Sequence, residues 1–98
     1  MYIHLGGDTV VPLREVVGIF DMDGTTLSKS SRSFLADAQK GGRVVNVTTE
    51  LPRSFVVCAD THGNETVYIC QIAPATLRRR AARGYAPLTE ADGIDIGT

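Results

Sequence analysis

The stretch "SFVVCADTHGNETVYIC", residues 54–70, decides the fold. It holds two apolar runs, residues 54–59 and 66–70, separated by a polar segment at 60–65. Valine, isoleucine and aromatic residues dominate both runs, and these residue types favour β-strands. The Gly63-Asn64 pair between the runs tolerates positive φ, as tight hairpin turns require. The stretch therefore predicts an antiparallel hairpin, which argues for an antiparallel sheet rather than a doubly wound parallel one.

Four further strands are predicted around this hairpin. Residues 1–5 and 9–11 form short extended runs joined by Gly6-Gly7-Asp8, which predicts a second hairpin. Residues 16–20 are apolar without a helical period, which predicts a strand. Residues 43–47 alternate in polarity and predict another strand, and Pro52 interrupts the extended structure after it. All of the strands are thus expected to pair in one small, mostly antiparallel sheet.

The remaining sequence predicts two helices. In residues 32–40, Phe34, Leu35 and Ala38 share one helical face, with polar side chains opposite. The glycines at 41–42 provide a left-handed exit, and the serines at 28, 30 and 31 are candidate N-caps. The second helix opens at Ala73-Pro74, with proline near the first position, and is expected to end near residue 84.

Length and composition indicate one folded domain. The chain has 98 residues, a hydrophobic content of 43 % and a net charge of −1, which fit a small globular protein. Residues 86–98 carry three acidic residues, no basic ones, two glycines and one proline, so they predict a disordered acidic tail. We therefore expect an α+β fold with two helices over residues 1–85, followed by the tail.

The segment "FDMDGTTL", residues 20–27, resembles the first motif of the haloacid-dehalogenase phosphotransferases. In that family the aspartates matching Asp21 and Asp23 would be nucleophile and general acid around magnesium. The mechanism also needs a lysine, a Ser/Thr and further carboxylates that follow parallel strands. The later lysine candidates are Lys29 and Lys40, and the later Asp cluster, Asp92 and Asp95, falls in the predicted tail. We therefore reject the phosphatase and expect no catalytic residue, metal or cofactor.

A cluster of arginines is the second functional signal. Arg79, Arg80 and Arg83 share one face of the second predicted helix, roughly opposite Leu77 and Ala81. Guanidinium groups bind phosphate oxygens well, so this helix is a candidate DNA-contacting surface. The alternative is a solvated helix whose arginines complement its C-terminal dipole or meet the acidic tail. The full candidate set for DNA contact is Arg14, Arg53, Arg78, Arg79, Arg80 and Arg83.

The cysteines and aromatic residues indicate a structural role. Cys58 and Cys70 lie in apolar runs without metal-ligand spacing, and a cytoplasmic protein with reduced thiols is expected. The sequence shows no signal peptide and no apolar run long enough to span a membrane. The aromatic residues expected to pack in the core are Tyr2, Phe20, Phe34, Phe55 and Tyr68.

Taken together, six segments resemble the bacterial extracellular-matrix regulators RemA and RemB, most closely the RemB-like branch. The resemblance covers residues 1–83, and its segments, in order, are "MYIHLGGD", "VVGIFD", "FLADAQKGG", "PRSFVV", "VYI" and "PATLRRR". It implies an α+β fold related to LytTR-type DNA-binding domains and self-assembly into rings. For RemA it also implies DNA-binding activation of biofilm-matrix operons.

The chain departs from RemA at the residues that contribute to DNA contact. RemA-like proteins carry two adjacent arginines before the strand matching residues 54–59, whereas this chain has Glu50-Leu51-Pro52 and retains Arg53. An arginine before the strand matching residues 16–20 is replaced by Glu15, with Arg14 one position earlier. The DNA surface of RemA therefore does not transfer residue by residue, and the arginines of the second helix are the candidate substitute.

From these observations we expect a non-enzymatic transcriptional regulator of biofilm and extracellular-matrix genes. It would bind double-stranded DNA as a homo-oligomer, through arginine–phosphate contacts repeated around the assembly. The alternative is a structural or interaction protein whose arginine helix binds an acidic protein surface without binding DNA.

Overall fold

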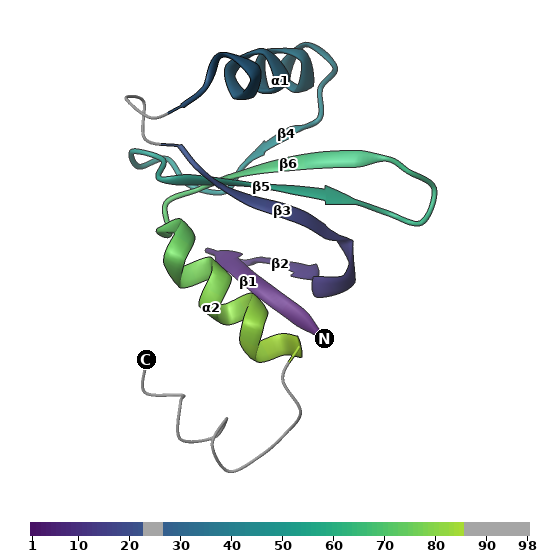
Figure 1. Cartoon of the computed structure of the whole chain (residues 1–98), viewed down its shortest axis with the longest axis vertical. Coiled ribbons are helices and arrows are strands. Elements are labelled where there is room, and N and C mark those ends of the chain that lie inside the picture. The colour runs from purple at the N-terminus through teal and green to yellow at the C-terminus, as the bar shows by residue number, and fades with distance from the viewer. Residues whose placement is uncertain (23–26, 86–98) are drawn as a thin grey trace.

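The computed structural model of the protein describes residues 1–22 and 27–85, and Figure 1 labels its strands and helices. The predicted tail at 86–98 lies outside the described residues. In chain order the elements are β1 (Tyr2–Gly6), β2 (Thr9–Pro12), the 3-10 turn η1 (Leu13–Glu15), β3 (Val16–Asp21), α1 (Lys29–Lys40), β4 (Val44–Asn46), β5 (Ser54–Ala59), β6 (Glu65–Cys70) and α2 (Pro74–Tyr85). The α+β class and both helices are confirmed.

The strands form two sheets, which corrects the expectation of a single one. β1 and β2 make a two-stranded antiparallel sheet, and the other four strands are ordered β3-β5-β6-β4. The β5–β6 hairpin is antiparallel as predicted, but β4 pairs with β6 in parallel. The reason is that the chain reverses twice after β4, once in the loop to β5 and once in the hairpin, so β6 runs in the same direction as β4.

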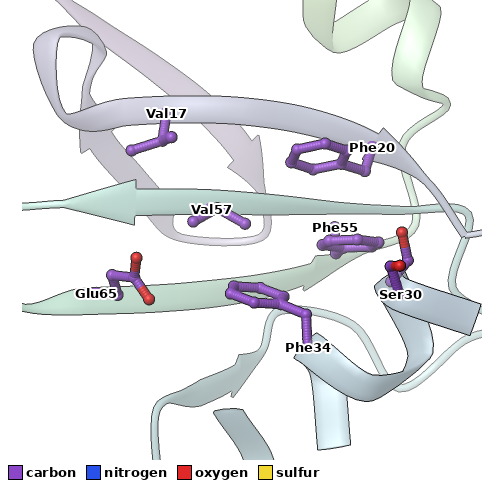
Figure 2. Close-up of a pocket in the computed structure, with 8 residues that line it drawn as sticks. Val17, Phe20, Ser30, Phe34, Phe55, Val57 and Glu65 are labelled. Carbon is purple, nitrogen blue, oxygen red and sulfur yellow. The ribbon is translucent and has the colours of Figure 1, made fainter. Parts of the chain in front are cut away.

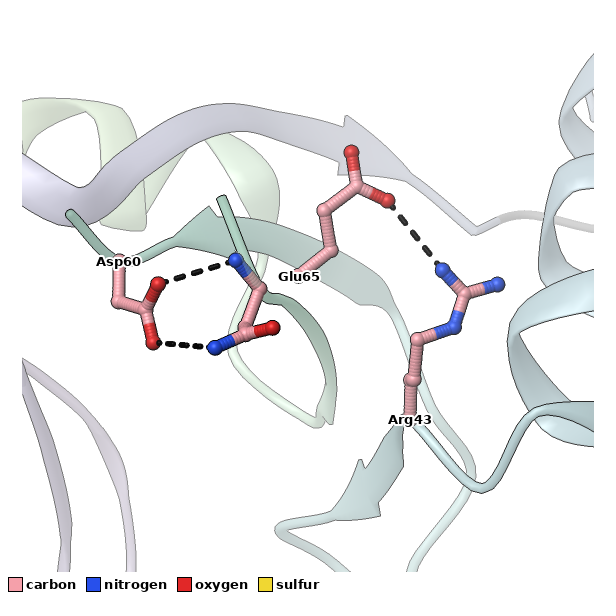
Figure 3. Close-up of polar contacts among 4 residues, drawn as sticks. Arg43, Asp60 and Glu65 are labelled. Carbon is pink, nitrogen blue, oxygen red and sulfur yellow. Dashed lines mark hydrogen bonds and ion pairs between the residues drawn. The ribbon is translucent and has the colours of Figure 1, made fainter. Parts of the chain in front are cut away.

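The hairpin turn is closed by one aspartate. The carboxylate of Asp60 accepts hydrogen bonds from the backbone N–H groups of His62, at 2.8 Å, and Asn64, at 3.0 Å. The side-chain amide of Asn64 also donates to the carboxylate of Asp60, which Figure 3 labels, at 3.2 Å. These bonds hold the pKa of Asp60 below its ordinary value, and the bond from the backbone N–H of Asn64 contributes most. Gly63 adopts the positive φ, +81°, that the sequence predicted for this turn.

Local signals also set the ends of α1. The hydroxyl of Ser28 accepts a hydrogen bond from the backbone N–H of Ser31 at 3.1 Å, which makes Ser28 the N-cap among the three candidate serines. At the other end Gly42 has φ +70°, the left-handed conformation expected after the helix. The predicted apolar face is confirmed, because Ala38 is fully buried and Phe34 and Leu35 pack against the same core.

The four-stranded sheet lies between two unequal layers (Figure 1). One face packs against α1, and the buried residues on that side are Ala38, Phe55, Val57, Val67 and Ile69. The other face packs against β1, β2 and α2, and the buried residues there are Ile3, Leu5, Val11, Leu13, Val56, Cys58, Cys70 and Leu77. Consecutive residues of β5 therefore point alternately into the two cores, as the pleat of a strand requires.

Two of the five aromatic residues predicted for the core are exposed. Tyr2 is 65 % exposed and Phe20 is 41 % exposed, whereas Phe55 is only 2 % exposed. Tyr2 lies on the face of β1 that points away from the core, as the burial alternation of that strand shows. Phe20 lies on a part of the sheet face that α1 does not cover. No helix within the described residues is long and apolar enough to cross a membrane.

Candidate functional site

The arginine helix α2 is anchored by one fully buried leucine. Leu77 is 0 % exposed and belongs to the core between α2, the N-terminal strands and the four-stranded sheet. Around the helix, Arg78 and Arg79 are exposed, while Arg80 and Arg83 are partly buried. This corrects the predicted outward row of Arg79, Arg80 and Arg83, because burial of Leu77 turns Arg80 toward the N-terminal strands.

Two of the predicted DNA-contacting arginines bind edge strands of their own chain. A guanidinium N–H of Arg78 donates to the backbone carbonyl of Ile19 in β3 at 3.1 Å. Arg80 likewise donates to the carbonyl of His4 in β1 at 2.9 Å. Both acceptors lie in strands at a sheet edge, where unpaired carbonyls need a partner. These bonds join α2 to both sheets, and each guanidinium retains further N–H donors.

Arg79 lies on the outward side of α2. It is exposed, and its guanidinium reaches the hydroxyl of Thr76 one turn earlier in the same helix at 3.4 Å. α2 contains no acidic residue over its twelve positions, so Arg79 lies in a locally positive field. Together with Arg78, it forms the solvent-facing part of the predicted arginine surface.

The structure brings Arg53 toward the start of α2 but places Arg14 elsewhere. The backbone N–H of Arg53 donates to the carbonyl of Cys70 at 2.8 Å, next to the short link that enters α2. The neighbouring Ser54 hydroxyl holds that link by donating to the carbonyl of Ile72 at 2.7 Å. Arg14, by contrast, precedes the opposite end of β3, whose six residues span roughly 17 Å at about 3.3 Å each.

Sequence reasoning missed an apolar groove on the α1 side of the sheet. The groove encloses about 300 Å³ between α1 and the β3–β5 strands. Figure 2 shows its side chains converging, with phenyl rings on one side and Ser30 and Glu65 toward its two ends. Its lining residues are Val17, Phe20, Ser30, Ser31, Phe34, Phe55, Val57 and Glu65.

The groove has a built aromatic floor. The rings of Phe20 and Phe55 stack with centroids 5.0 Å apart and an interplanar angle of 18°. Phe20 folds over Gly18, where a Cβ atom would lie 2.6 Å from the ring. A glycine inside a strand can mark a close approach of this kind, so Gly18 is the signal from which the position of the ring could have been inferred.

Of the two aspartates of the rejected phosphatase motif, the structure describes one. Asp21 is an exposed residue at the end of β3, whereas Asp23 lies outside the described residues. Within residues 1–22 and 27–85, no three His, Cys, Asp or Glu side chains gather as a metal site would require. The described residues therefore give the phosphatase hypothesis no support.

Both cysteines are buried free thiols. Cys58 and Cys70 are 3 % and 0 % exposed and lie in the core beneath α2. Burial raises the pKa of the Cys58 thiol to about 11, with smaller contributions from Glu15 and Cys70. Burial likewise raises the pKa of Cys70 to about 11. Reactive cysteines have lowered pKa values and access to solvent, so these thiols are packing residues.

The fold and its surfaces define a small α+β domain with an arginine helix that braces two sheet edges. The chain belongs to the RemA-like family, since the family described as "Extracellular matrix regulatory protein A-like" matches residues 2–81. It is also 36 % identical, over 81 residues, to the Extracellular matrix regulatory protein B of Bacillus subtilis (strain 168). That match covers 83 % of this chain and 90 % of the relative, and it confirms the resemblance drawn from the sequence segments.

Proposed function

We propose that this member of the extracellular matrix regulators is a cytoplasmic, non-enzymatic transcriptional regulator. It binds double-stranded DNA as a homo-oligomer, through phosphate contacts made by arginines. The observation that carries the proposal is the exposed Arg78–Arg79 pair on an acid-free helix that two arginine–carbonyl bonds hold against both sheets. A cationic row on a rigid helix keeps its side chains in position for phosphate, and so less entropy is lost on binding.

Within this proposal the arginines have different roles. Arg79 contacts phosphate directly, and Arg53 extends the surface from the start of α2. Arg78 and Arg80 position the helix through their bonds to β3 and β1 and offer their remaining N–H donors to DNA. Arg14 belongs to a separate position near the opposite end of β3 and adds little to the same contact.

One subunit with a net charge of −1 binds DNA weakly by this route. Repetition of the arginine surface around a homo-oligomer raises the overall affinity without new contacts, because each further binding event is intramolecular. Self-assembly is therefore part of the proposed mechanism.

The test is a DNA-binding titration at two salt concentrations. Wild type is expected to bind more tightly at low salt, with a log-affinity slope that grows by about 0.9 for each phosphate contact. Arg79→Ala should lower that slope by about one for each subunit engaged. Arg32→Ala is the matched control, because Arg32 is an exposed arginine on α1, across the sheet from α2.

One observation supports the alternative function, an interaction protein that does not bind DNA. Arg78 and Arg80 already bind backbone carbonyls, as arginines with a purely structural role do. The alternative is an interaction protein whose α2 meets an acidic protein surface. If no DNA binding occurs at low salt while the oligomer stays intact, the DNA-binding proposal is wrong and this alternative stands. Equal salt slopes for Arg79→Ala and Arg32→Ala would exclude Arg79 as the phosphate contact.

A further inference from the structure

The apolar groove beside α1 is a preformed recess that no side chain of residues 1–22 or 27–85 fills. Two of the large apolar residues that line it, Val17 and Phe20, are 66 % and 41 % exposed. The stack of Phe20 on Phe55 and its close approach to Gly18 hold the ring in one place. A rigid apolar recess of about 300 Å³ can take one or two aliphatic side chains from a partner.

The same chain carries a matching projection. Leu51 is 84 % exposed, more than any other large apolar side chain in the described part of the chain. The loop that holds it is braced, since the backbone N–H of Glu50 donates to the Thr48 hydroxyl at 2.9 Å. Pro52 follows and restricts the backbone further. Leu51 is therefore held away from its own core, with little loop entropy left to lose on docking.

The loop that carries Leu51 begins on the side of the four-stranded sheet opposite the groove. Thr48 and Thr49, which begin the loop, line a hollow shared with Leu5 and the Gly6-Gly7 turn of the N-terminal sheet. The groove lies on the other side, under α1. An exposed projection and a separate groove can pair between copies arranged head to tail.

Charges beside the two patches agree with this pairing. A shallower hollow continues from the groove through Ser30 and Phe34 and adds Lys29, with Asp37 one turn further along α1. Glu50 is exposed next to Leu51. With Leu51 in the groove, the Glu50 carboxylate can approach the Lys29 ammonium and the first-turn serine hydroxyls, which offers it a cation and hydrogen-bond donors.

We propose that Leu51 of one copy inserts into the apolar groove of a second copy, with Glu50 directed to Lys29. This inference rests on the homo-oligomeric part of the proposed function and identifies the surfaces that would form it. The contact is heterologous, so each bound copy still has a free projection or a free groove. Assembly then continues until a ring closes or a filament grows.

Two variants and their mixture test the proposal. Val17→Glu places a charge in the groove, and Leu51→Glu places one on the projection; both sites are solvent-exposed, so the fold should survive. Each variant alone should lose more than about tenfold in self-association. Mixed one to one, they should form dimers that grow no further, because one intact groove meets one intact projection. The control is Val10→Glu, an exposed valine on β2 outside the groove, which should assemble like wild type.

Light scattering or analytical ultracentrifugation supplies the masses, and circular dichroism checks that each variant folds. If both variants still assemble, or if their mixture stays monomeric, the proposed interface is wrong even though the oligomer stands. Monomeric wild type at every concentration would overturn the homo-oligomer itself, which separates the two failures. Glu50→Lys and Lys29→Glu should each weaken assembly, and their combination in one chain should restore it. If the two losses in affinity simply add in the double variant, then Glu50 and Lys29 do not pair.

Discussion

Replacing Gly18 by alanine tests how the groove is built. A Cβ atom at this position would lie 2.6 Å from both Cε2 and Cζ of Phe20, closer than such atoms approach in proteins. Gly18 does not have a positive φ, so its backbone accepts alanine without strain. The ring of Phe20 must therefore swing away, which breaks its stack on Phe55.

The expected magnitude follows from opposing contributions. Loss of the stack costs about 0.5–1.5 kcal/mol, and further exposure of the half-buried ring costs about 1 kcal/mol more. Alanine offsets about 0.5–1 kcal/mol of this, since it lowers the entropy of the unfolded chain. Gly18→Ala should thus lower the free energy of unfolding by about 1 kcal/mol. In a Phe20→Ala background the clash disappears, and the same change should raise it by about 0.5–1 kcal/mol.

The assay is urea unfolding of the four proteins of this double-mutant cycle. Each is measured at two protein concentrations, so that self-association does not enter the comparison. The reasoning predicts a change of sign between the two backgrounds. If Gly18→Ala destabilises both backgrounds equally, then the ring of Phe20 does not occupy the space above Gly18. The variant should also self-associate more weakly, because the groove floor is displaced.

Three further outcomes are expected. Arg78→Ala should lower the free energy of unfolding by about 0.5–1 kcal/mol through loss of its bond to β3, whereas Arg79→Ala should leave it unchanged in the same urea titration. At pH 8 a pKa of about 11 leaves about one in a thousand of the Cys58 and Cys70 thiols ionised, so a thiol reagent should label the folded protein at least ~100-fold more slowly than the unfolded one. Because both pKa values are raised in the folded protein, the free energy of unfolding should fall as the pH rises from 9.0 toward 11. Because the pKa of Asp60 is lowered in the folded protein, its carboxylate stabilises the hairpin at pH values above its ordinary pKa of 3.8, and this stabilisation is lost as the pH falls through the folded pKa. Asp60→Ala should therefore flatten the acid limb of the curve of stability against pH.

The proposed DNA surface illustrates where sequence reasoning stops. Spacing along α2 correctly predicted a helix with clustered arginines, since helix periodicity depends on neighbouring residues alone. It could not predict that Arg80 bonds to His4, 76 residues earlier, or that Arg78 bonds to Ile19, because those acceptors come from strands distant in sequence. Of the predicted outward row, Arg79 is exposed as expected, whereas Arg80 turns toward β1.

The groove illustrates the same limit for apolar residues. A phenylalanine in an apolar run predicts burial, and Phe55 follows that rule while Phe20 does not. Their difference depends on how far α1 extends across the sheet, which no short stretch of sequence records. Gly18 was the one local sign, and its meaning became clear only when the ring was seen above it.

By itself, the sequence determined what short-range chemistry decides. The turn at Gly63-Asn64, a serine cap at the start of α1, the exit at Gly42 and the family all follow from neighbouring residues or from matching segments in order. Only the tertiary structure decided that β4 pairs in parallel with β6, that the N-terminal strands form their own sheet, and which side chains remain exposed. Those features arise from contacts between residues far apart in the chain, whose free energy depends on the packing of the whole domain rather than on any single segment.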